Sequence, residues 1–401
     1  MSQAAPRRGF ENKEFKERLD KVHKVITENN LDGILFSSEP EIRYFTGFFT
    51  QFWQSPTRPW FIFIPVDKRP VAIIPSIGQR LMRDCFIEEI YTWSSPAGDY
   101  DGIQLLSEII SKYSKSTHNV GLMMGRETNF RAPLNDINKM FVNLRETAKF
   151  VDVTKNIQHL KMIKSSAEIE KIRHICGITS DVFESVPNWI SADMPLSQVF
   201  RQFKIQALSA GVDDVSYLVG AAGSGGYYDI IAPPNDRPIR DGDILMLDTG
   251  CIWDGYFCDF DRNFRFGKVN DEAESAHRTL IESIEKVAKS IQPGRTKSKD
   301  LFETMNCILR PDMNDSSAMA EENVGRYGHG LGMQLTEPPS HTNWDQTIIE
   351  AGMVLTLEPS INYGKENFLM VAEENILVTE SGVEFLSKPV GKELPHIPVG
   401  H

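Results

Sequence analysis

The chain has 401 residues, of which 41% are hydrophobic and 24% charged, and its formal net charge is −12. This composition predicts an ordinary globular protein long enough for two domains. The negative charge, without any run of Lys and Arg, argues against a nucleic-acid partner, and no segment approaches the roughly 20 apolar residues of a membrane span.

Cysteine usage and the first residues indicate the compartment. The 5 cysteines are scattered, without a Cys-x-x-Cys pair, as in reduced proteins without a disulfide framework. MSQAAPRRG is followed by the charged segment ENKEFKERLDK, so the apolar centre of a signal peptide is missing. We therefore expect a cytoplasmic protein.

Residues 1–154 alternate between helical and strand patterns. A helix is predicted over 13–30, where apolar residues recur at helical spacing, and GIQLLSEIISKY predicts another. The apolar runs DGILFSS, RPWFIFIP, RPVAIIP and NVGLMM predict buried strands. Alternating strands and helices indicate an α/β domain.

A second domain is expected over residues 155–401. KNIQHLKMIKSSAEIEKIR predicts a helix capped by Ser165 or Ser166, with Glu168 or Glu170 in its first turn. A further helix is predicted at 271–291, where it ends at Gln-Pro-Gly. Helices and long antiparallel strands are expected between and after these two segments.

The segment LMLDTGCIWDGYFCDFDR, residues 245–262, places several aspartates in an apolar, strand-like setting. Asp254-Gly255 is a strong two-residue hairpin turn, which would pair Trp253 with Tyr256. Counting outward, Asp248 then faces Asp261, and side-chain alternation puts Asp248, Asp259 and Asp261 on one face of the hairpin. Such carboxylates repel one another unless a cation neutralises them, although a solvated face is the ordinary alternative.

Three further candidates lie near the C-terminal end. His329 stands between glycines in GRYGHGLGMQL, Glu358 ends the apolar strand VLTLEPS, and Glu373 lies in MVAEENILVTE. Each alone has an ordinary structural explanation. Together with Asp248 and Asp259 they form an oxygen-rich set with one imidazole, which suits one or two Mn, Co, Fe or Zn ions.

The ordered motifs GDILMLDTG, GYFCDFDRNF, GHGLGM, LTLEPS and EENILVT resemble the peptidase M24 family, which includes aminopeptidase P, prolidase and creatinase. EIRYFTGF within the first 150 residues similarly resembles the family's creatinase-type N-terminal domain. The resemblance implies an α/β (α+β) chain in which a creatinase-like N-terminal domain precedes a C-terminal domain of the pita-bread fold. It also implies a metal-dependent hydrolase that cleaves an amide or related C–N bond.

The resemblance also implies a ligand set for two divalent metal ions. Asp259 and Glu373 would bridge the ions, Asp248 would complete one of them, and His329 with Glu358 would complete the other. Glu358 is also the candidate for moving a proton at the attacking water, so His329 and Glu358 are the catalytic candidates. Asp261 stands where the family usually has threonine, so it is expected to act as an acid outside the ligand set that makes the site more negative.

Other positions depart from the family pattern. Family peptidases carry a histidine 17 or 18 residues before the first aspartate, where this chain has Ile231 and Ile230. Another histidine is usual 7 residues after His329, where Thr336 stands, and aminopeptidase P-like enzymes have one at the position of Gly325. Only His341 lies close enough in sequence to substitute.

A second group of candidates could hold a substrate. GFFTQFWQSPTRPWF, residues 47–61, clusters Trp53, Arg58 and Trp60 in a predicted loop, and Tyr227 with Tyr228 could line the same pocket. A guanidinium suits a carboxylate, and an aromatic face suits a cationic or cyclic group. In creatinase-like relatives this region reaches the partner's site, so the resemblance implies a homodimer, although the loop could equally be a plain dimer contact.

Three functions are compatible with the sequence. The first is a hydrolase of short peptides, similar to Xaa-Pro aminopeptidase or prolidase. The second is a non-peptidase acting on a small amino-acid derivative, similar to creatinase, ectoine hydrolase or the dimethylsulfoniopropionate lyases. The third is an inactive peptidase-like binding module, which the intact ligand set argues against. The missing histidines predict weak cleavage of Xaa-Pro dipeptides and better turnover of a small amino-acid derivative.

Overall fold

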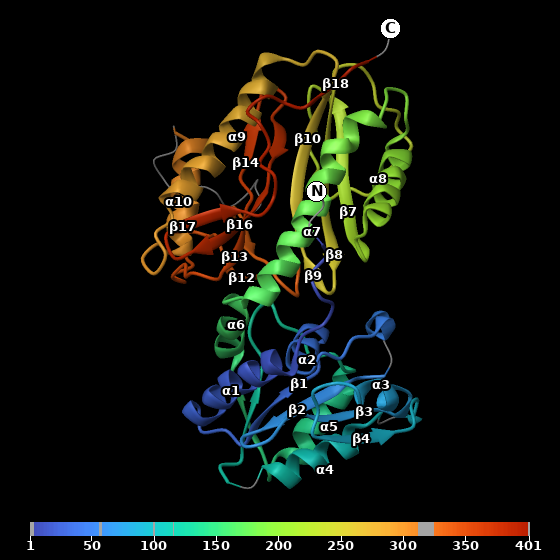
Figure 1. Cartoon of the computed structure of the whole chain (residues 1–401), viewed down its shortest axis with the longest axis vertical. Coiled ribbons are helices and arrows are strands. Elements are labelled where there is room, and N and C mark those ends of the chain that lie inside the picture. The colour runs from blue at the N-terminus through green and yellow to red at the C-terminus, as the bar shows by residue number, and fades with distance from the viewer. Residues whose placement is uncertain (1–3, 56–57, 99–100, 115, 312–324, 400–401) are drawn as a thin grey trace. The chain divides into compact units, whose positions relative to one another are not determined.

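The computed structural model describes residues 4–55, 58–98, 101–114, 116–311 and 325–399. The chain divides into two compact units, one of Arg7–Lys161 and one of Met162–His401 together with Met1–Pro6. Figure 1 shows the secondary structure within each unit.

The N-terminal unit contains a six-stranded mixed sheet in the order β4-β3-β2-β1-β5-β6. Its strands are β1 (Gly33–Phe36), β2 (Phe61–Pro65), β3 (Val71–Pro75), β4 (Glu89–Trp93), β5 (Asn119–Leu122) and β6 (Lys149–Asp152). Its helices are α1 (Asn12–Glu28), α2 (Glu39–Thr46), α3 (Gln79–Met82), α4 (Ile103–Tyr113), α5 (Leu134–Leu144) and α6 (Thr154–Met162), with short 3₁₀ turns η1 (Gln51–Gln54) and η2 (Ser76–Gly78). Every residue of β2 and β3 is buried, as expected for central strands covered on both faces.

The helices and strands predicted for this unit are confirmed. The helix predicted over 13–30 is α1, which buries Phe15, Val22 and Ile26 along one face. The predicted strands are β1, β2, β3 and β5, and GIQLLSEIISKY forms α4. One apolar cluster of the unit lies between the sheet and the helices α4 and α5.

The C-terminal unit is built around two antiparallel sheets. The first has the order β18-β10-β8-β7, with β9 paired to β8, and the second has the order β12-β11-β13-β16-β17. Its strands are β7 (Asp214–Ser224), β8 (Asp243–Trp253), β9 (Tyr256–Phe257), β10 (Phe260–Phe266), β11 (His329–Gly330), β12 (Glu337–Ser340), β13 (Val354–Leu357), β14 (Ser360–Tyr363), β15 (Phe368–Val371), β16 (Glu374–Thr379), β17 (Gly382–Phe385) and β18 (His396–Ile397).

Helices cover both sheets. They are α7 (Ser166–Ser185), α8 (Leu196–Ala210), α9 (Asp271–Ser290) and α10 (Ser298–Leu309), with a 3₁₀ turn η4 (Val186–Asn188). Helices α7 and α8 pack against β7 and β8, whereas α9 and α10 share an apolar core with β13 and β16 (Figure 1). Ser165 caps α7 and forms a capping box with Glu168, as predicted from the sequence.

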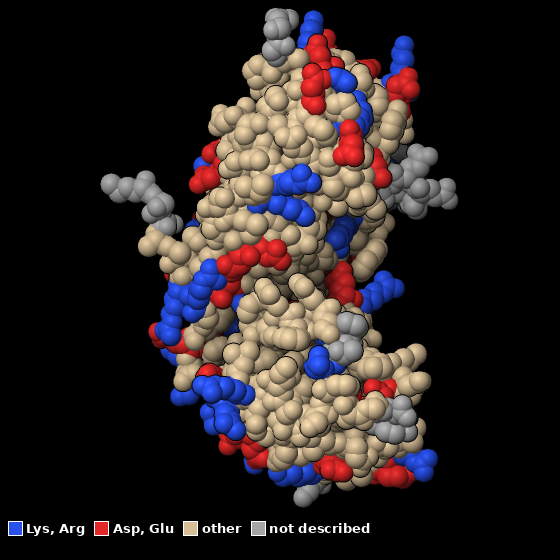
Figure 2. All heavy atoms as spheres, turned by 90° about the vertical axis from the view of Figure 1, so that its right-hand side faces the viewer, with Lys and Arg blue, Asp and Glu red and all other residues tan. Residues whose placement is uncertain are grey.

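The charges on the surface and the lengths of the apolar helices test whether a nucleic acid or a membrane is a partner. On the face drawn in Figure 2, Lys and Arg are interspersed with Asp and Glu, so this face offers no extended basic patch. Among the described residues, no helix combines the length and the apolar character needed to cross a bilayer.

Candidate metal centre

The β8–β10 hairpin carries three aspartates on one face. Asp254 and Gly255 both have positive φ, at 47° and 76°, as a two-residue hairpin turn requires. Trp253 pairs with Tyr256, and Asp248 pairs with Asp261, which confirms the predicted register. Asp259 lies two residues before Asp261 and therefore shares its face.

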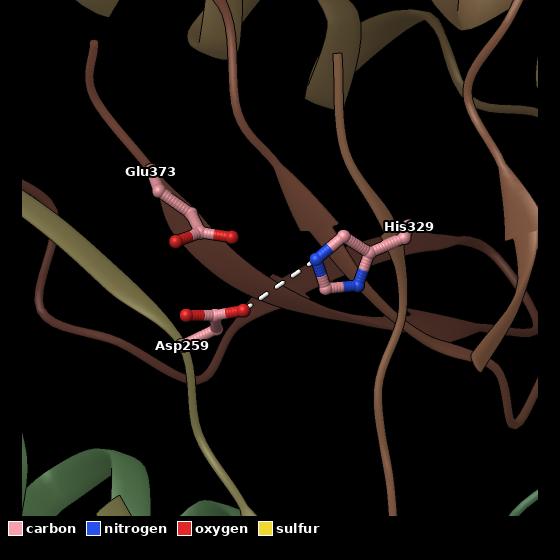
Figure 3. Close-up of side chains that lie close together, drawn as sticks. All are labelled: Asp259, His329 and Glu373. Carbon is pink, nitrogen blue, oxygen red and sulfur yellow. Dashed lines mark ion pairs between the residues drawn. The ribbon is translucent and has the colours of Figure 1, made fainter. Parts of the chain in front are cut away.

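The second sheet supplies the other candidates. His329 begins β11, Glu358 directly follows β13, and Glu373 directly precedes β16. Ligand atoms of Asp259, His329 and Glu373 all lie within 4.8 Å of one another, and Figure 3 shows the three side chains converging. All three are buried, whereas Asp248 and Glu358 are partly exposed. Segments far apart in the sequence thus meet in one cluster.

The orientation of His329 suits a ligand. Its Nδ1 lies 2.9 Å from the carbonyl oxygen of Gly330, which can only accept, so Nδ1 carries the hydrogen. In the neutral ring the other nitrogen, Nε2, then presents a lone pair, and it lies 3.5 Å from Oδ2 of Asp259. A second-sphere hydrogen bond of this kind commonly fixes the tautomer of a metal-binding histidine.

Asn375 positions Asp259. The backbone N–H of Asp259 donates to Oδ1 of Asn375 at 3.1 Å, and Nδ2 of Asn375 donates to the carbonyl oxygen of Asp259. Asn375 lies on β16, two residues after Glu373, and its side chain is fully buried. One amide thus connects the two sheets where their carboxylates approach each other.

Tyr217 is a member of the site that the sequence did not reveal. Its hydroxyl group contacts carboxylate oxygens of both Asp248 and Asp259. A Cβ at Gly250 would come within 2.6 Å of the Tyr217 ring, so the ring needs a glycine at this position. The register between β7 and β8 shifts between Val215 and Tyr217, and this bulge turns Tyr217 to the carboxylate face.

Burial and mutual repulsion raise the pKa of several carboxylates in and beside the cluster. Burial is the largest cause and mutual repulsion the next, and together they raise the pKa of Asp248, Asp261 and Glu373 well above the ordinary values. Burial likewise raises the pKa of Glu358 to about 7. Among the described residues, Oε1 of Glu373 has no hydrogen-bond partner although it is buried. Divalent cations fit this donor set, because they would neutralise the repulsion and pair the orphaned oxygen.

We expect the stability gained from a bound metal to increase with pH. Burial raises the pKa of Glu358 from 4.5 to about 7, so the folded protein holds this proton more tightly than the unfolded chain does. The resulting contribution to the free energy of unfolding is complete below about pH 4.5 and is lost as pH rises through about 7. Bound Mn²⁺ would neutralise the Glu358 carboxylate in place of the proton. The increase in Tm on adding Mn²⁺ should therefore be larger at about pH 8 than at about pH 5.5. Equal increases at both pH values would contradict this expectation.

Several proposed substrate contacts lie in packed surroundings. His341 is fully buried, and its Nδ1 lies 2.8 Å from Oγ of Ser298, on the side of α10. Tyr227 is buried, and its hydroxyl group donates to Oδ1 of Asn263. Tyr228 is exposed and its ring lies over that of Phe368.

Within the N-terminal unit, part of the predicted aromatic loop is buried in the core. The rings of Trp53 and Trp60 lie 6.0 Å apart and both contact Phe48. Trp60 is only 2% exposed, whereas Arg58 is partly exposed. The carbonyl oxygen of Arg58 accepts a hydrogen bond from Nη1 of Arg131.

The positions that depart from the family pattern have their own partners. Oγ1 of Thr336 accepts a hydrogen bond from Nη2 of Arg326 at 3.2 Å. Ile231 is 75% exposed, whereas Ile230 packs against the core of the unit. Burial raises the pKa of Glu358, and the charge of Arg326 offsets a part of that rise. Thr336 thus stands where family peptidases usually have histidine, and Arg326 is its hydrogen-bond partner.

Buried carboxylates and an imidazole between two antiparallel sheets define a site of the metallohydrolase type. The chain belongs to metallopeptidase family M24, whose model matches residues 170–380, and residues 18–163 match the creatinase/prolidase N-terminal domain. The family and the fold class predicted from the sequence are therefore confirmed, and the chain is a hydrolase of this metal-dependent family.

The relatives match over nearly the whole chain. An Xaa-Pro dipeptidase from Pyrococcus furiosus is 23% identical over 376 residues, which cover 93% of this chain and 98% of the relative. The crystal structure of a prolidase from Thermococcus sibiricus aligns with a TM-score of 0.82 at 21% identity, covering 95% of this chain and 99% of that one. A dipeptidase from Mycobacterium ulcerans aligns with a TM-score of 0.80 at 20% identity, covering 98% of this chain and 100% of that one. At this identity the structural likeness shows the fold.

Proposed function

We propose that the chain is a two-metal hydrolase that cleaves the C–N bond of a short peptide, such as an Xaa-Pro dipeptide, or of a compact amino-acid-derived substrate. The observation that carries the proposal is the buried group of Asp259, His329 and Glu373, with partly exposed Asp248 and Glu358 beside it. The names of the relatives make Xaa-Pro dipeptides the first substrate class to assay. The five free cysteines support the expectation of a reducing, cytoplasmic setting.

In this proposal Asp259, Glu373 and Asp248, together with His329 and Glu358, would hold the two ions. When bound, divalent ions such as Mn, Co, Fe or Zn would polarise the scissile carbonyl and lower the pKa of an attacking water. Glu358 is partly exposed and borders the cluster, so it can take a proton from the water and pass it to the leaving nitrogen. The hydroxyl group of Tyr217 contacts the carboxylates of Asp248 and Asp259 and would keep both in place for metal binding.

A non-peptidase reaction on a small amino-acid derivative is the second candidate. Thr336, bound to Arg326, occupies the position of a family histidine, and Ile231 occupies another. Loss of a positioned acid–base group typically costs about 10²–10⁴-fold in rate. A charged Arg326 beside the cluster instead favours a compact substrate that carries a carboxylate.

A substrate screen on metal-loaded protein separates the two candidates. We expect slow cleavage of Xaa-Pro dipeptides and faster turnover of small N-substituted amino acids. A kcat/KM of about 10⁵ M⁻¹s⁻¹ or more on an Xaa-Pro dipeptide, an ordinary enzyme value, would restore the plain dipeptidase. No hydrolysis of either class by protein shown to hold metal would contradict the hydrolase proposal.

We also propose a homodimer in which Arg58 serves the partner's site. Arg58 belongs to the same loop as Trp53, and its Nε is buried without a hydrogen-bond partner among the described residues. A guanidinium of this kind is suited to a substrate carboxylate.

Mixing two inactive variants tests the shared site. Arg58→Ala and Glu358→Gln subunits, exchanged to form mixed dimers, should recover about a quarter to a half of the activity, because one of the two sites is then intact. Light scattering establishes the assembly state and labelled subunits establish the exchange. A monomer, or no recovery after demonstrated exchange, would contradict the shared site.

A further inference from the structure

Asp261 is a buried acid whose charge the protein leaves unpaired. Its side chain is 2% exposed, and its Oδ1 has no hydrogen-bond partner among the described residues. It lies directly across from Asp248 on the neighbouring strand and two residues from Asp259, on the same face. Burying a carboxylate without a partner is costly, so the fold would not be expected to retain one by chance.

Arg262, the neighbouring cation on the strand, does not pair with the carboxylate of Asp261. Arg262 follows it in β10, and alternation directs its side chain to the opposite face. There Nη2 of Arg262 pairs with Oε2 of Glu374 at 2.8 Å, and Nη1 donates to the backbone carbonyl oxygens of Asp261 and Glu373. The guanidinium therefore supports the backbone of Asp261 while its carboxylate remains on the other side.

The phenol of Tyr227 does not neutralise the Asp261 carboxylate either. The hydroxyl group of Tyr227 donates to Oδ1 of Asn263 at 2.8 Å and accepts from the backbone N–H of Val371. The described neighbours of Asp261 on its own face thus include Asp248 and Asp259, which are themselves proposed ligands. Asp261 is outside the close group of Asp259, His329 and Glu373, but its orphaned oxygen lies on the face of the hairpin that carries the proposed ligands Asp248 and Asp259.

We propose that Asp261 is an additional oxygen ligand on the Asp248 side of the metal centre and biases the centre toward Mn²⁺ over Zn²⁺. This inference rests on the proposed two-metal function and extends it to a position where related peptidases usually have threonine. Mn²⁺ favours carboxylate oxygens and higher coordination numbers, whereas Zn²⁺ is satisfied by four ligands. An extra carboxylate therefore benefits Mn²⁺ more than Zn²⁺.

Metal titration of Asp261 variants tests the inference without an activity assay. Wild type, Asp261→Thr, Asp261→Asn and Asp261→Glu are stripped of metal and titrated with Mn²⁺ and with Zn²⁺ by calorimetry, with bound metal counted by mass spectrometry. Asp261→Thr and Asp261→Asn should weaken one Mn²⁺ site by about 10–100-fold, the range found when groups that support a metal site are changed. The Zn²⁺ affinity should fall less, and Asp261→Glu should retain most of the Mn²⁺ affinity.

Asp243→Asn is the matched control. Asp243 is a fully buried aspartate on β8, but it pairs with Arg237, away from the cluster. Its replacement should lower Tm and leave the Mn²⁺ affinity of the folded protein unchanged. The electron paramagnetic resonance spectrum of Mn²⁺ gives a second readout, because loss of a ligand from one ion changes the signal of the pair.

The outcomes separate this inference from the proposed function. Wild-type protein that binds neither ion would overturn the two-metal proposal and the inference together. Wild-type protein that binds two Mn²⁺ ions, with Asp261→Thr binding them equally well, would overturn the inference alone. Equal losses of Mn²⁺ and Zn²⁺ affinity would overturn the stated preference. If Asp261→Thr does not fold, Asp261→Asn decides, because it keeps the shape of the side chain.

Discussion

Glu373→Gln is expected to reduce bound metal and turnover together, with kcat/KM falling by about 10³-fold or more. Metal ions contribute several kcal/mol of transition-state stabilisation, and each 1.36 kcal/mol corresponds to a tenfold change in rate. Glu373 is buried in the cluster with Asp259 and His329, and its Oε1 has no hydrogen-bond partner among the described residues. Glutamine keeps the shape but removes the charge, and its amide group offers the ions one oxygen in place of two.

The neighbouring residue supplies a matched control for this prediction. Glu374 is equally buried, but it pairs with Arg262 and accepts a hydrogen bond from the N–H of Val390. Glu374→Gln should therefore lower Tm while the folded protein still binds its metal. Metal content by mass spectrometry and kcat/KM are measured for both variants. Similar metal loss in both would show that general destabilisation, and not a lost ligand, explains the effect of Glu373→Gln.

The sequence predicted the hairpin and its aspartates because the information there is local. Asp254-Gly255 can adopt the positive φ angles of a tight turn, and a two-residue loop fixes the pairing of every residue that follows. The pairing of Asp248 with Asp261 follows directly from that turn. The convergence of His329 and Glu373 with Asp259 depended instead on the family resemblance, since no local rule brings separate sheets together.

Tyr217 shows where local reasoning stops. Without the bulge at Ser216, simple alternation from Val215 opposite Cys251 would place Tyr217 opposite Thr249, on the other face of the sheet. The bulge moves Tyr217 opposite Gly250, whose missing side chain makes room for the ring. The composition of β7 predicts neither the bulge nor the need for a glycine at position 250. Asn375 was missed for a related reason, because its partner Asp259 lies on the other sheet.

Trp60 illustrates the same limit in the N-terminal unit. An aromatic residue in a loop rich in Pro and Arg suggests a substrate contact as readily as a packing contact. In the structure, the Trp60 ring lies against Gly78, where an added Cβ would come within 2.2 Å of the ring. Burial depends on which distant segment covers a residue, and the sequence around Trp60 does not contain that information.

Glu358→Gln is expected to lower kcat by about 10²–10⁴-fold even when the variant is saturated with metal, because a positioned group for proton transfer is lost. The backbone N–H of Glu358 donates to the carbonyl oxygen of Tyr327, so the chain path at this position does not depend on the carboxylate. Burial raises its pKa to about 7, which shows how strongly the site opposes its charge before cations are bound. Glu350→Gln is the control, because Glu350 precedes strand β13 whereas Glu358 follows it. This variant should leave kcat unchanged. Measuring kcat against metal concentration separates the two roles of Glu358: if saturating metal restores kcat to the wild-type value, Glu358 acts only as a ligand and the assignment of proton transfer to it is wrong.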